Sequence, residues 1–173
     1  MNNETSRLLE LVSLSKSYCE LCENAQEFSK EEFTDRTLDI LPRLYWNFFD
    51  LSAGVSLEEN DYFSDYVDES LYGRIQSSIA SVMGSQDTFL ETFEEDMKYS
   101  ETPITSSISE CMADLFQPLF NFVSIVHDSE GVQMQEAFIS CKEDFENYWS
   151  QTLCNVLKAL NNVKFGLREE EYD

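Results

Sequence analysis

Two pairs of glutamates have the spacing of a metal site. Glu91 and Glu94, and likewise Glu143 and Glu146, stand three residues apart, which places both carboxylates of a pair on one face of a helix. Oxygen ligands from facing helices can hold Mg²⁺, so a divalent-metal-dependent hydrolase of phosphorylated small molecules is one hypothesis. With 34 Asp and Glu in 173 residues, however, such pairs arise easily by chance. We favour solvated helix faces, with no catalytic residue and no cofactor.

A second group joins carboxylates to aromatic rings. Glu110 and Asp114 stand four residues apart, and Tyr148 and Trp149 follow in the last predicted helix. In a structural role, the Trp149 indole N–H is buried and donates to a carboxylate, with Asp114 the first choice. In a functional role, Glu110 and Asp114 face a ligand across the rings of Tyr148 and Trp149. We favour the structural role and keep these four residues as the candidate ligand site.

Other sources of chemistry are weak. Cys19 and Cys22 form a Cys-x-x-Cys pair, but both lie inside a predicted helix beside Glu20 and Glu23, which oppose thiolate formation. We expect the five cysteines to be small buried hydrophobic residues. His127, the one histidine, falls at the end of a predicted helix and suits capping. The five glycines are isolated, which excludes a Gly-rich phosphate loop.

The formal net charge of −23 limits the partners. Such a surface repels nucleic-acid phosphates and anionic lipids, so the sequence predicts neither partner and favours a protein with a basic surface. Mimicry of nucleic acid by the acidic surface ranks third among the hypotheses. The most apolar stretch, 115–126, is too short to span a bilayer, which needs about 20 apolar residues. The sequence shows no targeting signal, and free thiols fit a reducing compartment, so we expect a cytoplasmic protein.

The elements that position these residues are predicted to be helices. Gly and Pro together number 8, too few for the turns of an all-β protein. Apolar periodicity predicts helices over 5–26, from Ser29 through Phe48, over 68–84, 87–99 and 107–126, and a long last helix over 132–162. Ser29, Asp68 and Ser107 are the predicted N-caps. Pro42 and Pro118 each fall inside a helix and predict a kink or a break.

The same periodicity predicts which side chains face the core. In the second helix the inward set includes Leu41, Leu44, Tyr45 and Phe48. In the last helix it is Met134, Phe138, Cys141, Phe145, Tyr148, Thr152 and Val156, with Trp149 beside them. The region 51–66 lacks a clean period and is the longest predicted loop.

Several motifs, in the same order, resemble those of an uncharacterised bacterial family, domain of unknown function 5063. They are Tyr18-Cys19, Leu41-Pro-x-Leu-Tyr45, Ser107-Ile-Ser-Glu-Cys-Met-Ala-Asp-Leu-Phe116 with Leu119, and Phe145-Glu-Asn-Tyr-Trp149 with Leu153 and Ala159-Leu160. The resemblance spans residues 11–163 and implies an all-helical cytoplasmic protein with no established activity. Ser150 and Asn161 stand where glycine and histidine are common in that family.

The sequence as a whole predicts an all-α protein. We expect one helical bundle of five or six helices over residues 1–166, followed by an acidic tail over 167–173. Its function stays unknown at this point, and a non-enzymatic protein-interaction module is the favoured hypothesis.

Overall fold

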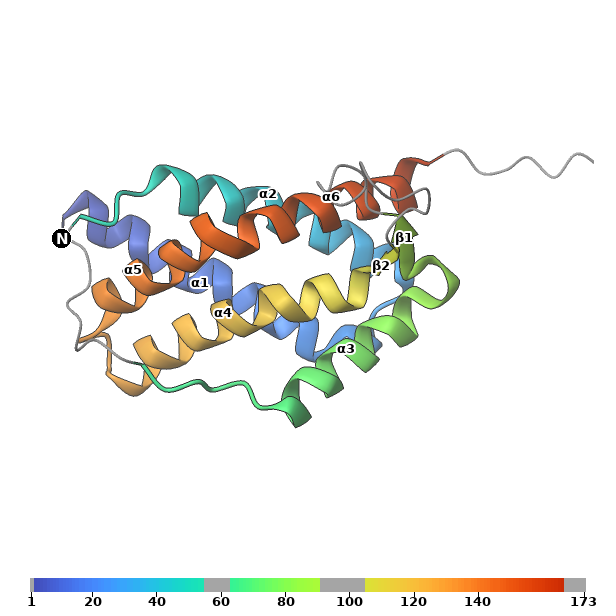
Figure 1. Cartoon of the computed structure of the whole chain (residues 1–173). Coiled ribbons are helices and arrows are strands. Elements are labelled where there is room, and N and C mark those ends of the chain that lie inside the picture. The colour runs from blue at the N-terminus through green and yellow to red at the C-terminus, as the bar shows by residue number, and fades with distance from the viewer. Residues whose placement is uncertain (1, 55–62, 91–104, 167–173) are drawn as a thin grey trace, which may run out of the picture.

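The chain forms an all-α helical bundle, as predicted, in a computed structural model that describes residues 2–54, 63–90 and 105–166 (Figure 1). Its helices are α1 (Asn3–Glu23), α2 (Lys30–Asp50), α3 (Glu69–Met83), α4 (Ile108–Asp128), α5 (Met134–Asp144) and α6 (Ser150–Phe165). Short 3-10 turns follow α1 (Ala25–Glu27) and α3 (Gly84–Gln86), and one π-helical turn (Phe145–Trp149) joins α5 to α6. The acidic tail at 167–173 lies outside the described residues.

Polar caps begin three of the helices where the sequence predicts them. Ser29 Oγ accepts a hydrogen bond from the backbone N–H of Glu32, Asp68 Oδ1 from that of Leu71, and Ser107 Oγ from that of Glu110. Each bond satisfies a backbone donor that the first helical turn leaves unpaired. Gly84 ends α3 with a positive φ of 58°, a backbone conformation that suits glycine.

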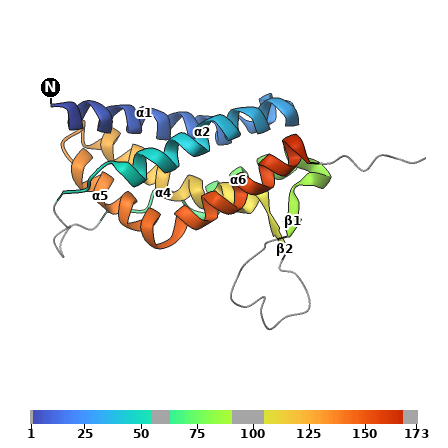
Figure 2. The same ribbon diagram turned by 90° about the horizontal axis from the view of Figure 1, so that it is seen from above.

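Helix α4 runs through the middle of the bundle and packs against α1, α3, α5 and α6 (Figures 1 and 2). The buried apolar side chains form one cluster that extends from Leu8 in α1 to Leu160 in α6. Inside it, the Tyr18 hydroxyl donates to the carbonyl oxygen of Met112 at 2.8 Å, which ties α1 to α4. Helices α2 and α6 also pack side by side. The outer surface of this pair forms one long side of the molecule (Figure 1).

Both internal prolines are accommodated without breaking a helix. Pro42 lies inside α2 and Pro118 inside α4, and each helix continues for at least two turns beyond its proline. Each proline removes one helical hydrogen bond, but tertiary packing on both sides of it retains the helix.

The predicted helix over 87–99 is wrong in its described part. Thr88–Leu90 is a strand, β1, that pairs antiparallel with β2 (Thr105–Ser107), and Phe89 stands opposite Ser106. The reason is the role of Asp87, whose carboxylate accepts from the backbone N–H and the hydroxyl of Ser109 at 2.7 Å each. Asp87 thus binds the start of α4 and does not begin a helix of its own. Residues 91–99 lie outside the described part of the chain.

The last predicted helix exists but contains a π turn. Helices α5 and α6 form one continuous helical segment through Phe145–Trp149. A π turn inserts one extra residue into the helical repeat, so the inward face moves by one position. Trp149 therefore faces the core with 3% exposure, whereas Tyr148, predicted to face inward, is 73% exposed.

Across the described residues, none of the helices combines the length and the apolar character needed to cross a membrane.

Candidate functional site

Three aromatic side chains stand on the outer surface of α2 and form what we call the aromatic face: Tyr45, Trp46 and Phe49. The core side of α2 already carries seven buried residues, so these rings lie beside or opposite it. Trp46 is 57% exposed and Phe49 is 63% exposed. The Phe49 ring centroid lies 6.3 Å from that of Tyr45, nearly parallel at 15°, and 6.3 Å from that of Trp46. The three rings therefore form one apolar surface.

The core holds the aromatic face in place from below. The ring centroids of Tyr45 and Phe145 lie 5.3 Å apart in an edge-on contact. Phe48, one turn away on the buried side of α2, makes a similar edge-on contact with Trp149, with ring centroids 4.9 Å apart. Tyr45 was predicted to face inward, but it stands at the rim, 36% exposed, with its ring anchored on Phe145.

Lys142 of α5 secures the end of α2 beneath this face. Its ammonium donates to the carbonyl oxygens of Phe49 at 3.3 Å and Leu51 at 2.6 Å. Phe49 belongs to the last turn of α2 and Leu51 directly follows it, where helix carbonyls have no helical partners. Lys142 is buried, with 9% exposure. Its positive charge caps the end of α2 and interacts favourably with the negative end of the helix dipole.

Charged pairs border the aromatic face. Asp39, Arg43, Trp46 and Asp50 stand on one side of α2 because they are spaced four, three and four residues apart. Arg43 Nη2 lies 2.6 Å from Asp39 Oδ2, and Nη2 of Arg7 in α1 lies 2.8 Å from Asp50 Oδ2. Both arginines next to the rings are therefore already matched by carboxylates.

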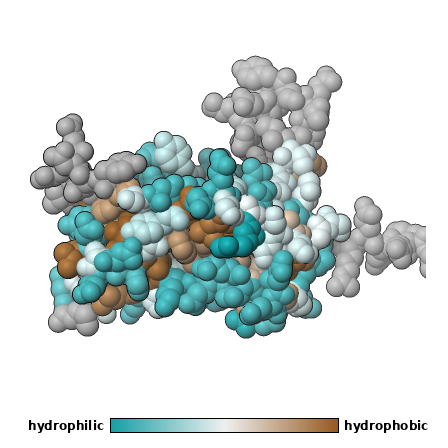
Figure 3. Space-filling view, turned by 90° about the horizontal axis from the view of Figure 1, so that it is seen from below, coloured by the Kyte–Doolittle hydropathy of each residue, from teal (hydrophilic) through white to brown (hydrophobic). Residues whose placement is uncertain are grey.

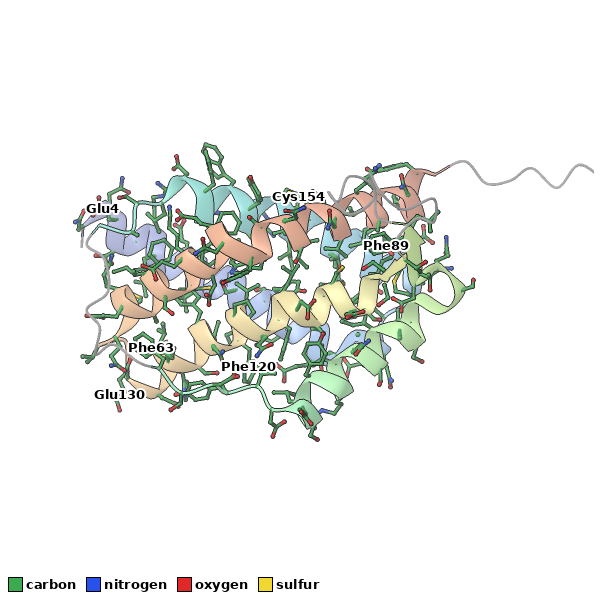
Figure 4. All side chains as sticks on the ribbon, viewed as in Figure 1. Glu4, Phe63, Phe89, Phe120, Glu130 and Cys154 are labelled. Atoms are coloured by element: carbon green, nitrogen blue, oxygen red, sulfur yellow. The ribbon has the colours of Figure 1, made fainter. Side chains whose placement is uncertain are left out.

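A groove of about 730 Å³ adjoins the aromatic face, and we call it the α6 groove. Tyr45 belongs to both surfaces. The remaining walls come from one side of α6 and from β1, where Figure 4 shows Cys154 and Phe89, respectively. The lining residues are Tyr45, Phe89, Leu90, Ser150, Gln151, Cys154, Asn155, Lys158, Ala159 and Asn162.

Among the described residues, the groove offers binding groups and no activated nucleophile. Cys154 is an exposed cysteine, which corrects the expectation that all five are buried, and partial burial raises its pKa above the ordinary value. Its sulfur therefore stays a neutral thiol near neutral pH and is a poor nucleophile. The other four cysteines are buried as predicted, and burial raises the pKa of Cys22 to about 12.

The four residues of the predicted ligand site do not come together. The Asp114 carboxylate accepts from the Tyr72 hydroxyl of α3 at 2.6 Å, and Glu110 is exposed one turn earlier on α4. Tyr148 points into solvent, and the Trp149 indole is buried. The expected Trp149–Asp114 hydrogen bond is wrong, because the indole N–H donates to the carbonyl oxygen of Cys141 at 3.2 Å. That carbonyl lies in α5 and also accepts from the backbone N–H of Phe145.

The structure describes only one of the two predicted metal-binding glutamate pairs. Glu91 and Glu94 lie outside the described residues. Glu143 and Glu146 are exposed, and Glu146 lies 4.0 Å from the Lys142 ammonium, an unfavourable neighbour for a bound cation. Within the described ranges, no group of three or more His, Cys, Asp or Glu side chains has the geometry to hold a metal ion.

A second hollow lies between α1 and α4. Its walls include Val12, Phe120 and Val126, and Figure 3 shows apolar side chains gathered among hydrophilic ones on the side of the molecule seen from below. His127 borders this hollow in the last turn of α4, as predicted, with Nδ1 3.3 Å from Asp128 Oδ1. The hydrogen bond from Tyr66 lowers the pKa of Asp128, and His127 adds to this effect.

A family model matches the whole range of described residues. The model is that of DUF5063, a domain of unknown function, and it matches residues 2–166. The chain belongs to the DUF5063 family. The sequence motifs predicted this membership, and the DUF5063 chain carries both the aromatic face and the α6 groove within the matched range.

One solved structure is similar along nearly its full length. The crystal structure of protein BF1032 from Bacteroides fragilis is 25% identical and superposes with a TM-score of 0.80, covering 95% of this DUF5063 chain and 96% of that chain. The similarity supports the same bundle in both proteins. The comparison with curated proteins gave no match.

Sequence reasoning missed the aromatic face, although a signal for it exists. Trp46 and Phe49 lie off the inward stripe of the second predicted helix, and large aromatic residues outside such a stripe indicate a binding surface. The α6 groove had no comparable signal, since the position of β1 beside α6 is a tertiary feature.

Proposed function

We propose that this DUF5063 protein is a non-enzymatic protein-interaction module of the bacterial cytoplasm, which acts without a cofactor. In this proposal, the aromatic face binds a basic, amphipathic segment of a partner protein. The observation that carries the proposal is the exposure of three contacting rings, Tyr45, Trp46 and Phe49, on a rigid helix.

Exposed rings in this arrangement suit protein recognition. Tryptophan, tyrosine and arginine are enriched among the residues that dominate binding energy at interfaces. Burial of an aromatic side chain removes about 150–250 Å² from water, so three adjacent rings can form the apolar centre of an interface. Because α2 is fixed by Lys142 and by the core rings beneath it, little order has to be gained on binding.

Charge selects the kind of partner. The chain carries a formal net charge of −23, and the arginines beside the aromatic face are paired with Asp39 and Asp50. The long-range field therefore attracts a positively charged segment and accelerates its encounter. An arginine of the partner can also stack on Trp46, the ring type that favours cations most.

Three synthetic helical peptides test this proposal. The first is amphipathic and basic, with leucine and lysine faces; the second keeps the leucines but replaces lysine by glutamate; the third keeps the lysines but replaces leucine by serine. We expect the first to bind best, measured by isothermal titration calorimetry. Replacing both Trp46 and Phe49 by Ala should weaken its binding by about tenfold or more.

Tyr148→Ala is the matched control, since this ring is at least as exposed as Trp46 and Phe49 and makes no ring contact with the aromatic face in the described structure. The control should leave the affinity unchanged. Equal binding of the first and third peptides, or an unchanged affinity in the Trp46 and Phe49 variant, would show attraction by charge alone and overturn the proposal.

A further inference from the structure

We infer that the hollow between α1 and α4 binds a small organic ammonium ion with an apolar body. The inference goes beyond the interaction module, because it concerns another surface of the molecule and a small ligand. The hollow has a volume of about 460 Å³, within the usual range of about 300–1,000 Å³ for small-molecule sites. Its lining residues are Val12, Lys16, Tyr66, Phe120, Val123, Ser124, Val126, His127 and Asp128.

The first argument is the apolar character of the walls. Val12 comes from α1, and Phe120, Val123 and Val126 come from α4. All four side chains are half-buried, so each still presents apolar surface to a ligand. The Phe120 ring is held from below by the fully buried Phe116, with stacked ring centroids 4.9 Å apart. Such walls suit a hydrocarbon group, which gains free energy on leaving water.

The second argument is a carboxylate fixed beside these walls. Asp128, at the end of α4, accepts a hydrogen bond from the Tyr66 hydroxyl, and its Oδ1 lies 3.3 Å from Nδ1 of His127. Both contacts lower the pKa of Asp128, so the carboxylate is charged near neutral pH. An ionised carboxylate offers about four acceptor sites, which leaves sites for an ammonium donor.

The third argument is a pair of aromatic rings that are held in place. Tyr66 and Phe120 both line the hollow, and aromatic rings attract organic cations. The backbone N–H of Tyr66 donates to Asn121 Oδ1 of α4 at 2.8 Å. Next to it, Asp65 Oδ1 accepts from the Val67 N–H at 3.0 Å and from Asn121 Nδ2 at 3.2 Å. Because this segment is fastened to α4, little order has to be gained on binding.

Charge decides the sign of the ligand. The formal net charge of −23 counts every residue of the chain, and its field attracts cations and repels anions. Lys16 also lines the hollow, but its side chain is 64% exposed and its ammonium lies 3.9 Å from Glu20 Oε1. Solvent and Glu20 therefore screen this opposing charge. The ligand that matches both the apolar walls and Asp128 joins a hydrocarbon group to an ammonium group.

Four small probes test the inference when each is titrated into the full chain and followed by NMR chemical shifts. Hexylammonium, hexanol and hexanoate share a hydrocarbon body and differ in charge, whereas methylammonium has the charge without the body. We expect hexylammonium to bind best and hexanoate to bind least among the three six-carbon compounds. The shifted backbone amides should be those of residues 120–128 and of Tyr66.

Three substitutions separate the contributions of charge and apolar surface. Asp128→Asn keeps an acceptor for Tyr66 but removes the charge, so it should weaken hexylammonium binding by about fivefold and leave hexanol binding unchanged. Val123→Ser should weaken the binding of both compounds by about threefold. Glu130→Gln is the matched control, because it removes an exposed carboxylate that stands apart from Phe120 and outside the described lining (Figure 4). This control should leave the affinity for hexylammonium unchanged.

The double replacement of Trp46 and Phe49 by Ala should also leave hexylammonium binding intact, which separates this inference from the interaction module. Four outcomes would overturn the inference. They are equal affinity for hexylammonium and methylammonium, equal or tighter binding of hexanoate, an unchanged affinity for hexylammonium in Asp128→Asn, and chemical shifts located at the aromatic face.

Discussion

Two tryptophans show how the surroundings of a residue decide its role. Trp149 is buried against Phe48 and Phe145, with its indole N–H bonded to the Cys141 carbonyl. Trp46 presents the same indole to solvent on the aromatic face. The first ring stabilises the bundle, and the second is available for a partner.

This contrast gives a matched pair of substitutions. Trp149→Ala should lower the free energy of unfolding by about 3–5 kcal/mol, because the core cannot fill the space that the ring leaves. Trp46→Ala should cost less than about 1 kcal/mol, since most of the ring is already in water. Urea denaturation measures both values. A loss of stability in Trp46→Ala as large as that in Trp149→Ala would mean that Trp46 belongs to the core.

At the same scale, the sequence predicted burial well wherever the helical repeat is regular. In α1 the predicted stripe of Leu8, Leu11, Ser15, Tyr18 and Cys22 is buried throughout. The prediction for Tyr148 is wrong because the π turn shifts the helical repeat by one residue, which places Trp149 in the core instead. A local pattern cannot reveal a shift that tertiary packing selects.

At the scale of the element, α2 depends on a cation from another helix. Lys142 lies among surface-like residues in the sequence, yet its ammonium caps the last turn of α2. The β1–β2 pair shows the same principle, since Asp87 reaches across to the start of α4. Both contacts join residues far apart in the chain, so helical periodicity gave no sign of them.

Lys142→Met tests the cap. Two carbonyls near the end of α2 would lose their donor, which should lower the free energy of unfolding by about 1–3 kcal/mol. Lys16→Met is the control, because its ammonium is exposed and lies 3.9 Å from Glu20 in a surface pair, worth about 0–1 kcal/mol. Chemical denaturation of the two variants gives the comparison. Equal losses in both would contradict the capping role.

At the scale of the whole molecule, the composition predicted the fold class and the charge, and the motifs predicted the family. Neither could locate the aromatic face beside the α6 groove, because that requires α2, α6 and β1 to be placed in space. The excess of 34 acidic over 11 basic residues acts on the molecule as a whole. It implies self-repulsion that added salt should relieve.

This self-repulsion predicts that the melting temperature depends on salt concentration. Raising NaCl from about 20 mM to about 300 mM shortens the Debye length and should raise the melting temperature. Differential scanning calorimetry in buffers of equal pH measures the change. A flat or falling melting temperature would show that local pairing already neutralises the charge.

A lower pH should stabilise the fold as well. Burial raises the pKa of Glu23, with Glu20 adding to the effect, and burial followed by Glu143 raises the pKa of Asp144. These two carboxyls therefore bind protons more readily in the folded state than in the unfolded chain, so their contribution to stability increases as pH falls from about 7 to about 5. The urea midpoint should rise over this interval, and by less in Asp144→Asn. A midpoint that falls from pH 7 to pH 5 would contradict these pKa shifts.

The central claim is that a basic partner segment binds at the aromatic face, and NMR chemical-shift mapping with the leucine–lysine peptide tests it most directly. Bound peptide should shift the backbone amide signals of residues 43–50 in α2 and the Trp46 indole signal, while the Trp149 indole signal and the amides of α3 change little. Shifts spread evenly over the acidic surface, or confined to the hollow between α1 and α4, would contradict the claim.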